Sequence, residues 1–329
     1  MNDGKVILFN PAISSMNEGD HIIFDGVRSQ INGMFPGYKQ YELPTQMPVS
    51  KKVLDWYKDI ELRFVCGTNI LKNNMLCEWG RIPHFKKFRQ WDVNLCRANL
   101  YGPVILVGCG WQKYQNEKDL YSKLLWNKLL STEYKHSVRD AYTQQKLSEL
   151  GITNTINTGC PTLWSLTKEH CKEIPAEKAN NVVTTITDYS QDLEKDQMML
   201  NVLSKNYDSV YLWLQGYEDD LYAKLLSLPI NCTVISGGLS EYDKLLGSEK
   251  DIEFVGTRLH GGIRALQHKK RTTFIAIDNR TIEMGDNFGL NYLRRTESDE
   301  LEEYLLKPHK CNIVIPEKEI EEFKSQFRR

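Results

Sequence analysis

The chain lacks several features that assign a sequence quickly to a broad class of proteins. No stretch approaches the roughly 18 consecutive apolar residues that cross a bilayer as a helix. Residues 1–10 lack the charged, then apolar, then small-residue order of a secretory signal. A Walker-type phosphate loop, GxxxxGKS or GxxxxGKT, is also missing. We therefore expect neither a membrane-spanning chain nor a Walker-type nucleotide site.

An excess of charge of one sign is lacking as well. The 42 lysines and arginines oppose 43 aspartates and glutamates, and the formal net charge is -1. A field this weak does not favour a nucleic acid partner. None of the eight cysteines forms a CxxC pair, which argues against a zinc site, and we expect no metal and no cofactor. Free, mostly buried thiols fit a reducing compartment and predict a cytoplasmic protein.

Short apolar runs alternate with segments of helical spacing along the whole chain. Runs without polar alternation are typical of parallel strands that are covered on both faces. The first series of expected strands comprises residues 5–10, 63–68, 103–108 and 135–140, and the second comprises 182–187, 209–216, 232–238, 252–260 and 272–278. Helices are expected between them at 119–130, 193–207 and 241–250. In the first of these, one broad apolar face is expected from Leu120, Leu124, Leu125, Trp126 and Leu129.

Two such series, joined by the polar residues 167–181, predict an α/β protein with two Rossmann-like domains facing a cleft. The 329 residues exceed the roughly 250–300 at which single cores stop growing. We place the N-terminal domain at 1–170 and the C-terminal domain at 171–329, and leave open whether the last helix packs back on the first domain. Ligands of open parallel sheets bind beyond the carboxyl ends of the strands, so functional side chains are expected there.

The strongest candidate site is residues 255–262, between an apolar strand and a helical run. If the chain is extended there, Arg258 and His260 point to one side and Leu259 to the other. A guanidinium binds carboxylate or phosphate, and an imidazole exchanges protons near neutral pH. Gly261 removes a side chain where the helix begins and leaves amide groups for an anion. This pattern predicts a site for an anionic substrate; the structural alternative is an arginine paired with a carboxylate and a histidine capping the helix.

The Asn17-Glu18-Gly19-Asp20 sequence follows the first expected strand and precedes a helix. Because Gly19 has no side chain, a ligand can approach the backbone there, two residues after Asn17. Asp20 can contact a sugar hydroxyl, or it can simply cap the helix. We therefore place Asn17, Gly19 and Asp20 at the acceptor or at the walls of the cleft, with capping as the structural alternative.

Two further strand ends carry charged side chains. Arg139 stands where a strand changes to a helix and offers a second cation, unless it is a surface arginine. Asp278, Arg280 and Glu283 follow the last strong strand within six residues and offer ligand contacts, unless they form a turn with a helix cap. Residues 81–97 interleave basic and aromatic side chains. That pattern fits a peripheral contact with anionic lipid, stacking on sugar rings, or a solvated helix with a buried aromatic edge.

With these motifs placed, the chain resembles the polysaccharide pyruvyl transferase family over most of its length. The most specific part is GTRLHGGIRALQHKKRTTFIAID, which holds the family's Arg-x-His-Gly element, and NEGD and SVRD match two further elements. The resemblance implies a glycosyltransferase-B-like fold. It also implies an enzyme that moves a pyruvyl group from phosphoenolpyruvate onto two hydroxyls of a sugar, in a cell-surface polysaccharide or its lipid-linked precursor, as a cyclic ketal.

Carried onto this sequence, the resemblance gives His260 the proton-transfer role. Arg258 and Arg139 would hold the anionic donor, and Leu259 and Gly261 would line the same pocket. The C-terminal domain would take the donor and the N-terminal domain the acceptor. Phosphoenolpyruvate would serve as a substrate and no cofactor is implied. A lipid-linked acceptor would bring the protein to the cytoplasmic face of the membrane.

Two other functions stay open from the residues. One is a nucleotide-sugar-dependent glycosyltransferase on the same scaffold, in which Asp278 and Glu283 could contact a base and a ribose. The other is a non-catalytic protein that binds an acidic sugar. Neither the acceptor sugar nor the oligomeric state can be read from the sequence.

Overall fold

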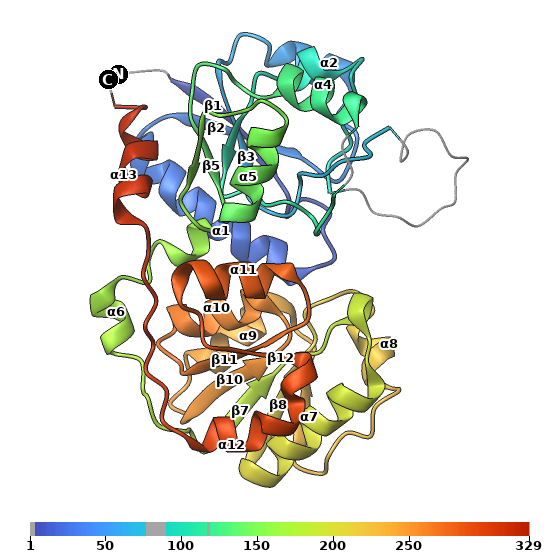
Figure 1. The fold of residues 1–329 in the computed structure, drawn as a ribbon, viewed down its shortest axis with the longest axis vertical. Coiled ribbons are helices and arrows are strands. Elements are labelled where there is room, and N and C mark those ends of the chain that lie inside the picture. Colours follow the sequence, from blue (N-terminus) through green and yellow to red (C-terminus); the bar gives the residue numbers. More distant parts are fainter. Residues whose placement is uncertain (1–3, 77–89, 117–118, 329) are drawn as a thin grey trace. The chain divides into compact units, whose positions relative to one another are not determined.

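The computed structural model describes residues 4–76, 90–116 and 119–328, so most of the basic and aromatic segment predicted at 81–97 lies outside the described residues. The chain divides into two compact units (Figure 1). The first comprises Met1–Ser15, Ile23–Trp164 and Pro316–Arg329, and the second comprises Met16–Ile22 and Ser165–Ile315. Within the described part of the chain, no helix is long and apolar enough to cross a membrane.

The first unit is built on a parallel sheet. Its strands are β1 (Lys5–Asn10), β2 (Lys39–Pro44), β3 (Leu62–Cys66) and β4 (Ile105–Val107), in the order β2-β1-β3-β4. A parallel pair, β5 (His136–Val138) and β6 (Thr155–Asn157), is joined to it by a bridge between Cys109 and Val138. The helices are α1 (Glu18–Met34), α2 (Lys51–Trp56), α3 (Ala98–Tyr101), α4 (Leu120–Leu129), α5 (Ala141–Glu149), the short 3-10 helix Pro161–Leu163 and α13 (Glu317–Ser325).

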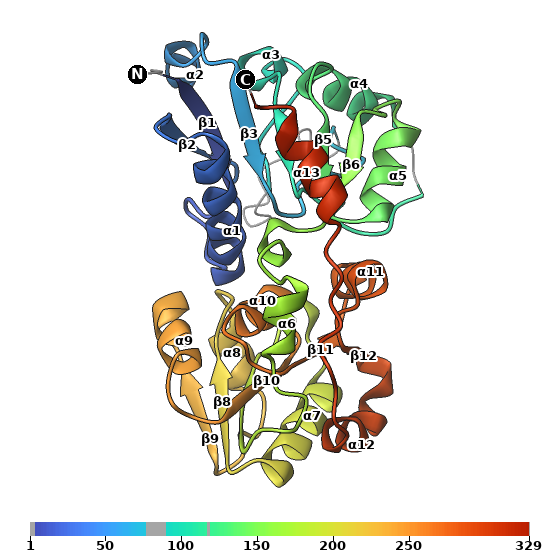
Figure 2. The same cartoon turned by 90° about the vertical axis from the view of Figure 1, so that its left-hand side faces the viewer.

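The C-terminal helix α13 packs in the first unit, against β5 and β6 (Figure 2). The Phe327 ring that follows it lies 5.5 Å from the ring of Phe35 and 5.4 Å from those of Phe64 and Tyr134. Gln326 Nε2 donates to the carbonyl oxygen of Lys135 at 3.1 Å. The chain therefore returns to the unit in which it began.

The second unit is a six-stranded parallel sheet in the order β12-β11-β10-β7-β8-β9. The strands are β7 (Asn181–Thr184), β8 (Ser209–Trp213), β9 (Cys232–Ile235), β10 (Ile252–Gly256), β11 (Thr272–Ala276) and β12 (Tyr292–Arg294). The helices are α6 (Lys168–Lys172), α7 (Leu193–Asn206), α8 (Asp219–Ala223), α9 (Gly238–Leu246), α10 (Leu259–Gln267), α11 (Asn279–Phe288) and α12 (Leu301–Leu306), with 3-10 turns at Asp188–Ser190 and Arg295–Glu300.

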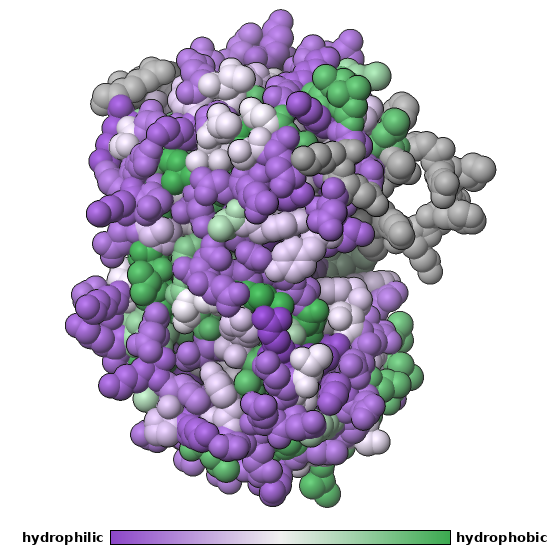
Figure 3. Space-filling view, viewed as in Figure 1, coloured by the Kyte–Doolittle hydropathy of each residue, from purple (hydrophilic) through white to green (hydrophobic). Residues whose placement is uncertain are grey.

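Both faces of this sheet are buried. Val255 and Ile275 join a core cluster with Leu200 and Leu203 of α7. Phe254 and Phe274 point to the other face, where their rings are 6.2 Å apart. Alternate residues of one strand thus serve two cores, which explains the continuously apolar sequence. Polar residues dominate the face of the molecule shown in Figure 3. The side chains of Leu221 in α8 and Leu225 after it are exposed.

The predicted α/β class with two Rossmann-like units is confirmed, and the expected strands match β1, β3, β4, β5 and β7–β11 within a few residues. The strands β2, β6 and β12 were missed. The expected apolar face of the 119–130 helix is partly wrong, because Leu120 and Leu124 are 70% and 51% exposed while Leu125, Trp126 and Leu129 are buried. The described cysteines are free thiols, and four of these seven are buried.

Candidate active site

The strand order of the second unit indicates where a ligand binds. β7 is the first strand of that unit, and β8 and β10 flank it, so the order in which strands are added reverses between β7 and β10. In open parallel sheets, ligands bind beyond the carboxyl ends of the strands at such a reversal. The segments that leave the sheet there are residues 185–190 after β7 and residues 257–258 after β10.

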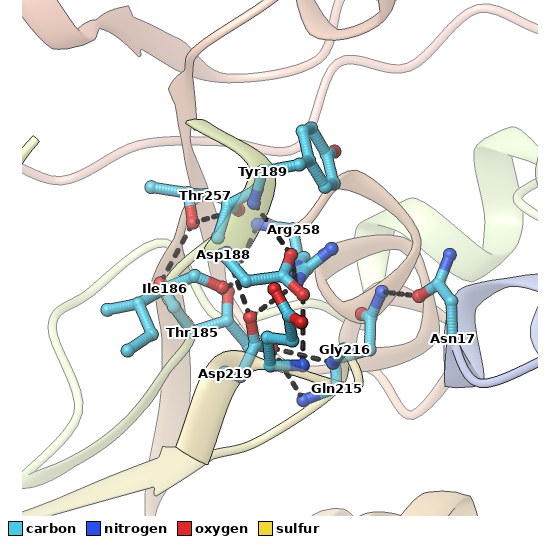
Figure 4. A network of polar contacts seen from close by, with 12 residues as sticks. Asn17, Thr185, Ile186, Asp188, Tyr189, Gln215, Gly216, Asp219, Thr257 and Arg258 are labelled. Atoms are coloured by element: carbon cyan, nitrogen blue, oxygen red, sulfur yellow. Dashed lines mark hydrogen bonds and ion pairs between the residues drawn. The ribbon is translucent and has the colours of Figure 1, made fainter. Parts of the chain in front are cut away.

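Arg258 leaves β10 as the residue before α10, and only 3% of it is exposed. Its Nε donates to the carbonyl oxygen of Ile186 at 3.0 Å. Its Nη2 donates to Asp188 at 2.9 Å and also to Asp219. The backbone N–H of Arg258 donates to Thr185 Oγ1 at 3.0 Å, and Figure 4 shows these contacts around the guanidinium. Arg258 is therefore ion-paired with two carboxylates. Pairing with a carboxylate was the structural alternative for this arginine in the sequence.

Asp219 is the carboxylate that joins this network. Its side chain is fully buried. Oδ2 accepts from the N–H groups of Gln215 at 3.0 Å and Gly216 at 2.6 Å. Oδ1 accepts from the N–H of Asp188 at 3.0 Å and from Arg258. One side chain thus ties together the segments that follow β7, β8 and β10.

Arg258 keeps its charge and one unused nitrogen. Burial lowers the pKa of the guanidinium, but the neighbouring Asp219, Tyr189 and Asp188 outweigh burial and raise this pKa above its ordinary value. Nε and Nη2 are occupied, whereas Nη1 has no hydrogen-bond partner among the described residues. The two N–H groups of Nη1 are therefore the part of Arg258 that can bind an external anion.

The prediction that the chain is extended from Arg258 to His260 is wrong. Helix α10 begins at Leu259, so His260 is its second residue and Gly261 its third. Successive helical residues turn by about 100°, and the two side chains do not share a face as they would in a strand. Leu259 and His260 are 4% and 6% exposed. The structure places the imidazole in the first turn of α10, where amide groups and the helix dipole favour an anion.

Gly262 allows α10 to pack closely on the sheet. A Cβ atom at this position would lie 2.2 Å from Phe274 Cε1 and 2.8 Å from Phe254 Cε1. Two aromatic rings of β10 and β11 therefore occupy the space that any other side chain would need. This packing is a structural reason for the second glycine of the motif.

The side chain of Gln215 lies between two glycines that belong to separate sequence motifs. A Cβ atom at Gly19 would lie 2.8 Å from Gln215 Nε2, and one at Gly261 would lie 3.0 Å from Gln215 Oε1. Gln215 Nε2 donates to Asn17 Oδ1 at 2.9 Å, and the Glu18 N–H donates to the Gln215 carbonyl oxygen at 3.0 Å. The first turns of α1 and α10 therefore meet at one buried amide.

Asn17, rather than Asp20, caps helix α1. Asn17 Oδ1 accepts from the N–H of Gly19 at 3.1 Å. Asp20 lies inside the first turn, where its N–H donates to the Asn17 carbonyl oxygen at 3.0 Å and its side chain is buried. The interpretation of Asp20 as the cap is wrong. Its burial also leaves little surface for a sugar hydroxyl.

The segment after β11 brings a second arginine to Arg258. Asp278 caps α11 by accepting from the N–H of Arg280 at 2.9 Å, and Arg280 Nε donates back to both oxygens of this carboxylate at 3.1 and 3.0 Å. The Tyr189 ring lies 5.0 Å from Arg258 Cζ and 5.6 Å from Arg280 Cζ. Burial lowers the pKa of Arg280, but Tyr189 and Asp278 raise it overall. Glu283 is half-buried one turn later in α11.

Arg139 belongs to the first unit, where its guanidinium contacts Asp140 and Asn69. Its Nε donates to Asp140 Oδ2 at 2.9 Å, its Nη2 lies 2.8 Å from the same oxygen, and its Nη1 donates to Asn69 Oδ1. Only 2% of Arg139 is exposed. Asp140 also caps α5, because its Oδ1 accepts from the N–H of Thr143 at 2.7 Å. These contacts give Arg139 a place in the packing of its own unit.

Comparison with known proteins assigns the family. The family model of polysaccharide pyruvyl transferase matches residues 17–279, which include the Asn17, Arg139 and Arg258 motifs. The chain belongs to this family. Membership makes the protein a transferase. No curated protein matches the sequence.

Solved structures show the fold of this transferase. UDP-GlcNAc 2-epimerase of Methanocaldococcus jannaschii, solved with UDP-GlcNAc and UDP, is 11% identical with a TM-score of 0.55 over 98% of each chain. MnaA of S. aureus, solved with UDP, is 10% identical with a TM-score of 0.54 over 92% of this chain and 89% of that chain. At these identities the likeness concerns the fold alone, which is glycosyltransferase-B-like.

Four residues of the candidate site belong to no sequence motif named above: Asp188, Tyr189, Gln215 and Asp219. Asp188, Tyr189 and Asp219 follow the predicted strands 182–187 and 209–216, whereas Gln215 lies inside the second of these ranges and just beyond the observed end of β8. None of the four is next to an arginine or histidine in the sequence. The carboxyl-end rule, applied to β7 and β8 as it was to β10, would have found them. Among the described residues, no group of three or more histidine, cysteine, aspartate or glutamate side chains could hold a metal ion.

Proposed function

We propose that this transferase moves a pyruvyl group from phosphoenolpyruvate onto two hydroxyls of a sugar, in a cell-surface polysaccharide or its lipid-linked precursor, and forms a cyclic ketal. One observation carries the proposal. Arg258, held by Asp188 and Asp219, keeps Nη1 without a partner among the described residues directly before the first turn of α10, which contains His260. The family match supports the same reaction.

The donor carries a carboxylate and a phosphate, so it needs two cationic or N–H-rich partners. Arg258 Nη1 is one. Arg280 is the better second cation of the same unit, because its side chain is 20% exposed, whereas Arg139 is almost fully buried in the other unit. Arg139 stays a predicted donor ligand from the sequence. The amide groups at the start of α10, from Leu259 to Gly261, supply further donors to an anion.

His260 is the proposed proton-transfer group. Protonation of the terminal methylene of phosphoenolpyruvate makes the carbon that bears the phosphate electrophilic. One sugar hydroxyl attacks this carbon, phosphate leaves with its bridging oxygen, and the second hydroxyl closes the ketal. Two carbon–oxygen bonds form and one breaks. The two sugar hydroxyls lose two protons in total; the methylene gains one proton when it becomes a methyl group, and the released phosphate takes up the other. An imidazole can carry these protons near neutral pH, and the proposed chemistry requires neither metal nor cofactor.

The test is a phosphate-release assay with phosphoenolpyruvate and a panel of sugar acceptors. Wild-type protein should release phosphate only when an acceptor is present. Arg258→Lys keeps a cation for Asp219 but has no second nitrogen for the donor, so kcat/KM should fall about 10–100-fold, the value of a lost hydrogen bond between a cationic donor and an anion. Arg264→Lys is the matched control, since Arg264 lies on the same helix and pairs with Asp243 at 2.6 Å away from this network.

The same assay separates the alternatives. A nucleotide-sugar-dependent glycosyltransferase of this fold would release a nucleotide from an activated sugar and ignore phosphoenolpyruvate. A non-catalytic protein would bind an acidic sugar without turnover. Either result would replace the pyruvyl transfer proposed here.

A further inference from the structure

Tyr189 stands at the centre of the donor-binding region proposed above, yet no sequence motif contains it. The ring lies within 5.0 Å of the Arg258 guanidinium and 5.6 Å of that of Arg280. Its hydroxyl accepts a hydrogen bond from Arg280 Nη2. Although it touches two arginines, 58% of Tyr189 is exposed.

The backbone around Tyr189 is held on both sides. The Tyr189 N–H donates to Asp188 Oδ1 at 2.8 Å, and the same carboxylate accepts from the N–H of Glu218 at 3.1 Å through Oδ2. On the other side, Arg295 Nη1 donates to the Ser190 carbonyl oxygen at 2.8 Å. The position of this exposed ring is therefore set by the turn that carries it, and does not depend on side-chain burial.

A phenol that accepts from a guanidinium still has its own proton to donate. Arg280 occupies a lone pair of the Tyr189 oxygen, so the O–H can point to a second acceptor. Arg280 Nη1 has no hydrogen-bond partner among the described residues, because Nε and Nη2 are the nitrogens bound to Asp278 and Tyr189. One phenol O–H and one guanidinium nitrogen thus lie side by side, both able to donate to an oxyanion.

We propose that Tyr189 binds one anionic group of the donor through its hydroxyl, together with Arg280, while its ring holds the Arg258 and Arg280 guanidiniums apart. The inference rests on the proposed pyruvyl transfer and adds a donor-binding residue to it. Two cations against one flat ring fit a substrate whose carboxylate and phosphate are attached to the same carbon atom. The ring stabilises both cations and the hydroxyl joins one of them at the ligand.

The experiment compares wild type, Tyr189→Phe and Tyr211→Phe. Tyr211 is the matched control, since Lys250 Nζ lies 5.0 Å above its ring and donates to its hydroxyl at 2.7 Å, outside this network. Removing the Tyr189 hydroxyl should weaken phosphoenolpyruvate binding and raise its KM about 3–30-fold, the loss of one hydrogen bond to an anion, with kcat changed less than about 2-fold. A purely structural role would instead lower the melting temperature and leave KM unchanged.

Phosphoenolpyruvate binding is measured by calorimetry and KM by phosphate release. Weaker binding in Tyr189→Phe but not in Tyr211→Phe supports the inference. If wild type binds and turns over the donor while Tyr189→Phe matches it, Tyr189 is not a donor ligand, although the proposed function stands. If wild type neither binds nor consumes phosphoenolpyruvate, both proposals are overturned.

Discussion

Arg258 and Asp219 form an ion pair from which solvent is almost absent, with side chains 3% and 0% exposed. The pair joins the residue that leaves β10 to the residue that begins α8. Arg258 balances the charge of Asp219. Three hydrogen bonds from backbone N–H groups stabilise the same carboxylate further. A buried carboxylate so arranged orients Arg258, whose Nη1 has no hydrogen-bond partner among the described residues.

Loss of the Asp219 charge should destabilise the protein. Asp219→Asn keeps the shape of the side chain but removes the negative charge that pairs with a buried guanidinium. The new side-chain NH₂ group would also face N–H groups that now donate to the carboxylate. We expect the free energy of unfolding to fall by about 2–4 kcal/mol in urea denaturation. Asp243→Asn, which alters the half-buried pair with Arg264, should cost no more than about 1 kcal/mol. Equal losses in the two variants would show that Asp219 has no special place in the site.

Addition of a methyl group at Gly262 should also destabilise the protein, because the Cβ would meet the rings of Phe274 and Phe254 at 2.2 and 2.8 Å. We expect Gly262→Ala to lose about 1–3 kcal/mol, the usual cost of overpacking. Gly33→Ala is the control, since a Cβ there would meet no atom within 4 Å. In helix α1 this change should be neutral or stabilising, by up to about 1 kcal/mol. A tolerated Gly262→Ala would contradict the packing of α10 on β10 and β11.

Removal of the His260 imidazole should affect the chemical step rather than donor binding. His260→Ala should lower kcat by roughly 10²–10⁴-fold, as is typical of general acid–base groups, with a small change in the KM for phosphoenolpyruvate. His268→Ala, which follows α10 at its other end, should keep kcat within about 2-fold. A variant at His260 with normal kcat would remove it from the mechanism.

The stability of the first unit should depend on the protonation of His136. The side chain is fully buried, Nδ1 accepts from the Leu106 N–H at 3.2 Å, and burial lowers the pKa of His136 from 6.5 to about 4. Since the unfolded chain binds a proton first as pH falls, His136 contributes full stability above pH 6.5 and loses it progressively towards the folded pKa.

Between pH 7 and pH 5 this loss amounts to about 2 kcal/mol. His136→Gln should be less stable at pH 7, but its free energy of unfolding should fall less over the same interval. The measurement is urea denaturation of both proteins at the two pH values. Parallel pH dependence in wild type and variant would show that His136 is not the titrating group.

Much of the sheet architecture could be predicted from the sequence, because buried parallel strands are continuously apolar. Runs such as 182–187 and 272–278 locate β7 and β11 within a few residues. β2 was missed because it is half-buried and carries polar side chains such as Gln40 and Glu42, which interrupt the apolar signal. Leu120 was assigned to the core by spacing alone, although it is 70% exposed at the first turn of α4.

The candidate site was predicted less completely. The Arg258 motif stands out in the sequence because arginine, histidine and glycine follow an apolar strand directly. Asp188 and Asp219 are 70 and 39 positions away from Arg258, and only the order of β7, β8 and β10 brings them to it. The extended geometry at 258–260 was wrong because the helix begins at Leu259, with the Gly262 N–H donating to the Arg258 carbonyl oxygen at 3.1 Å, and residue types alone do not fix that starting point.

The most direct test of pyruvyl transfer is the mass of the acceptor after incubation with phosphoenolpyruvate labelled with ¹³C in its three carbons. The account predicts that wild type adds the mass of labelled pyruvate less one water to the sugar, that Arg258→Lys does so far more slowly, and that Arg264→Lys matches wild type. An unchanged acceptor with wild-type protein across the panel, or equal labelling by wild type and Arg258→Lys, would contradict it.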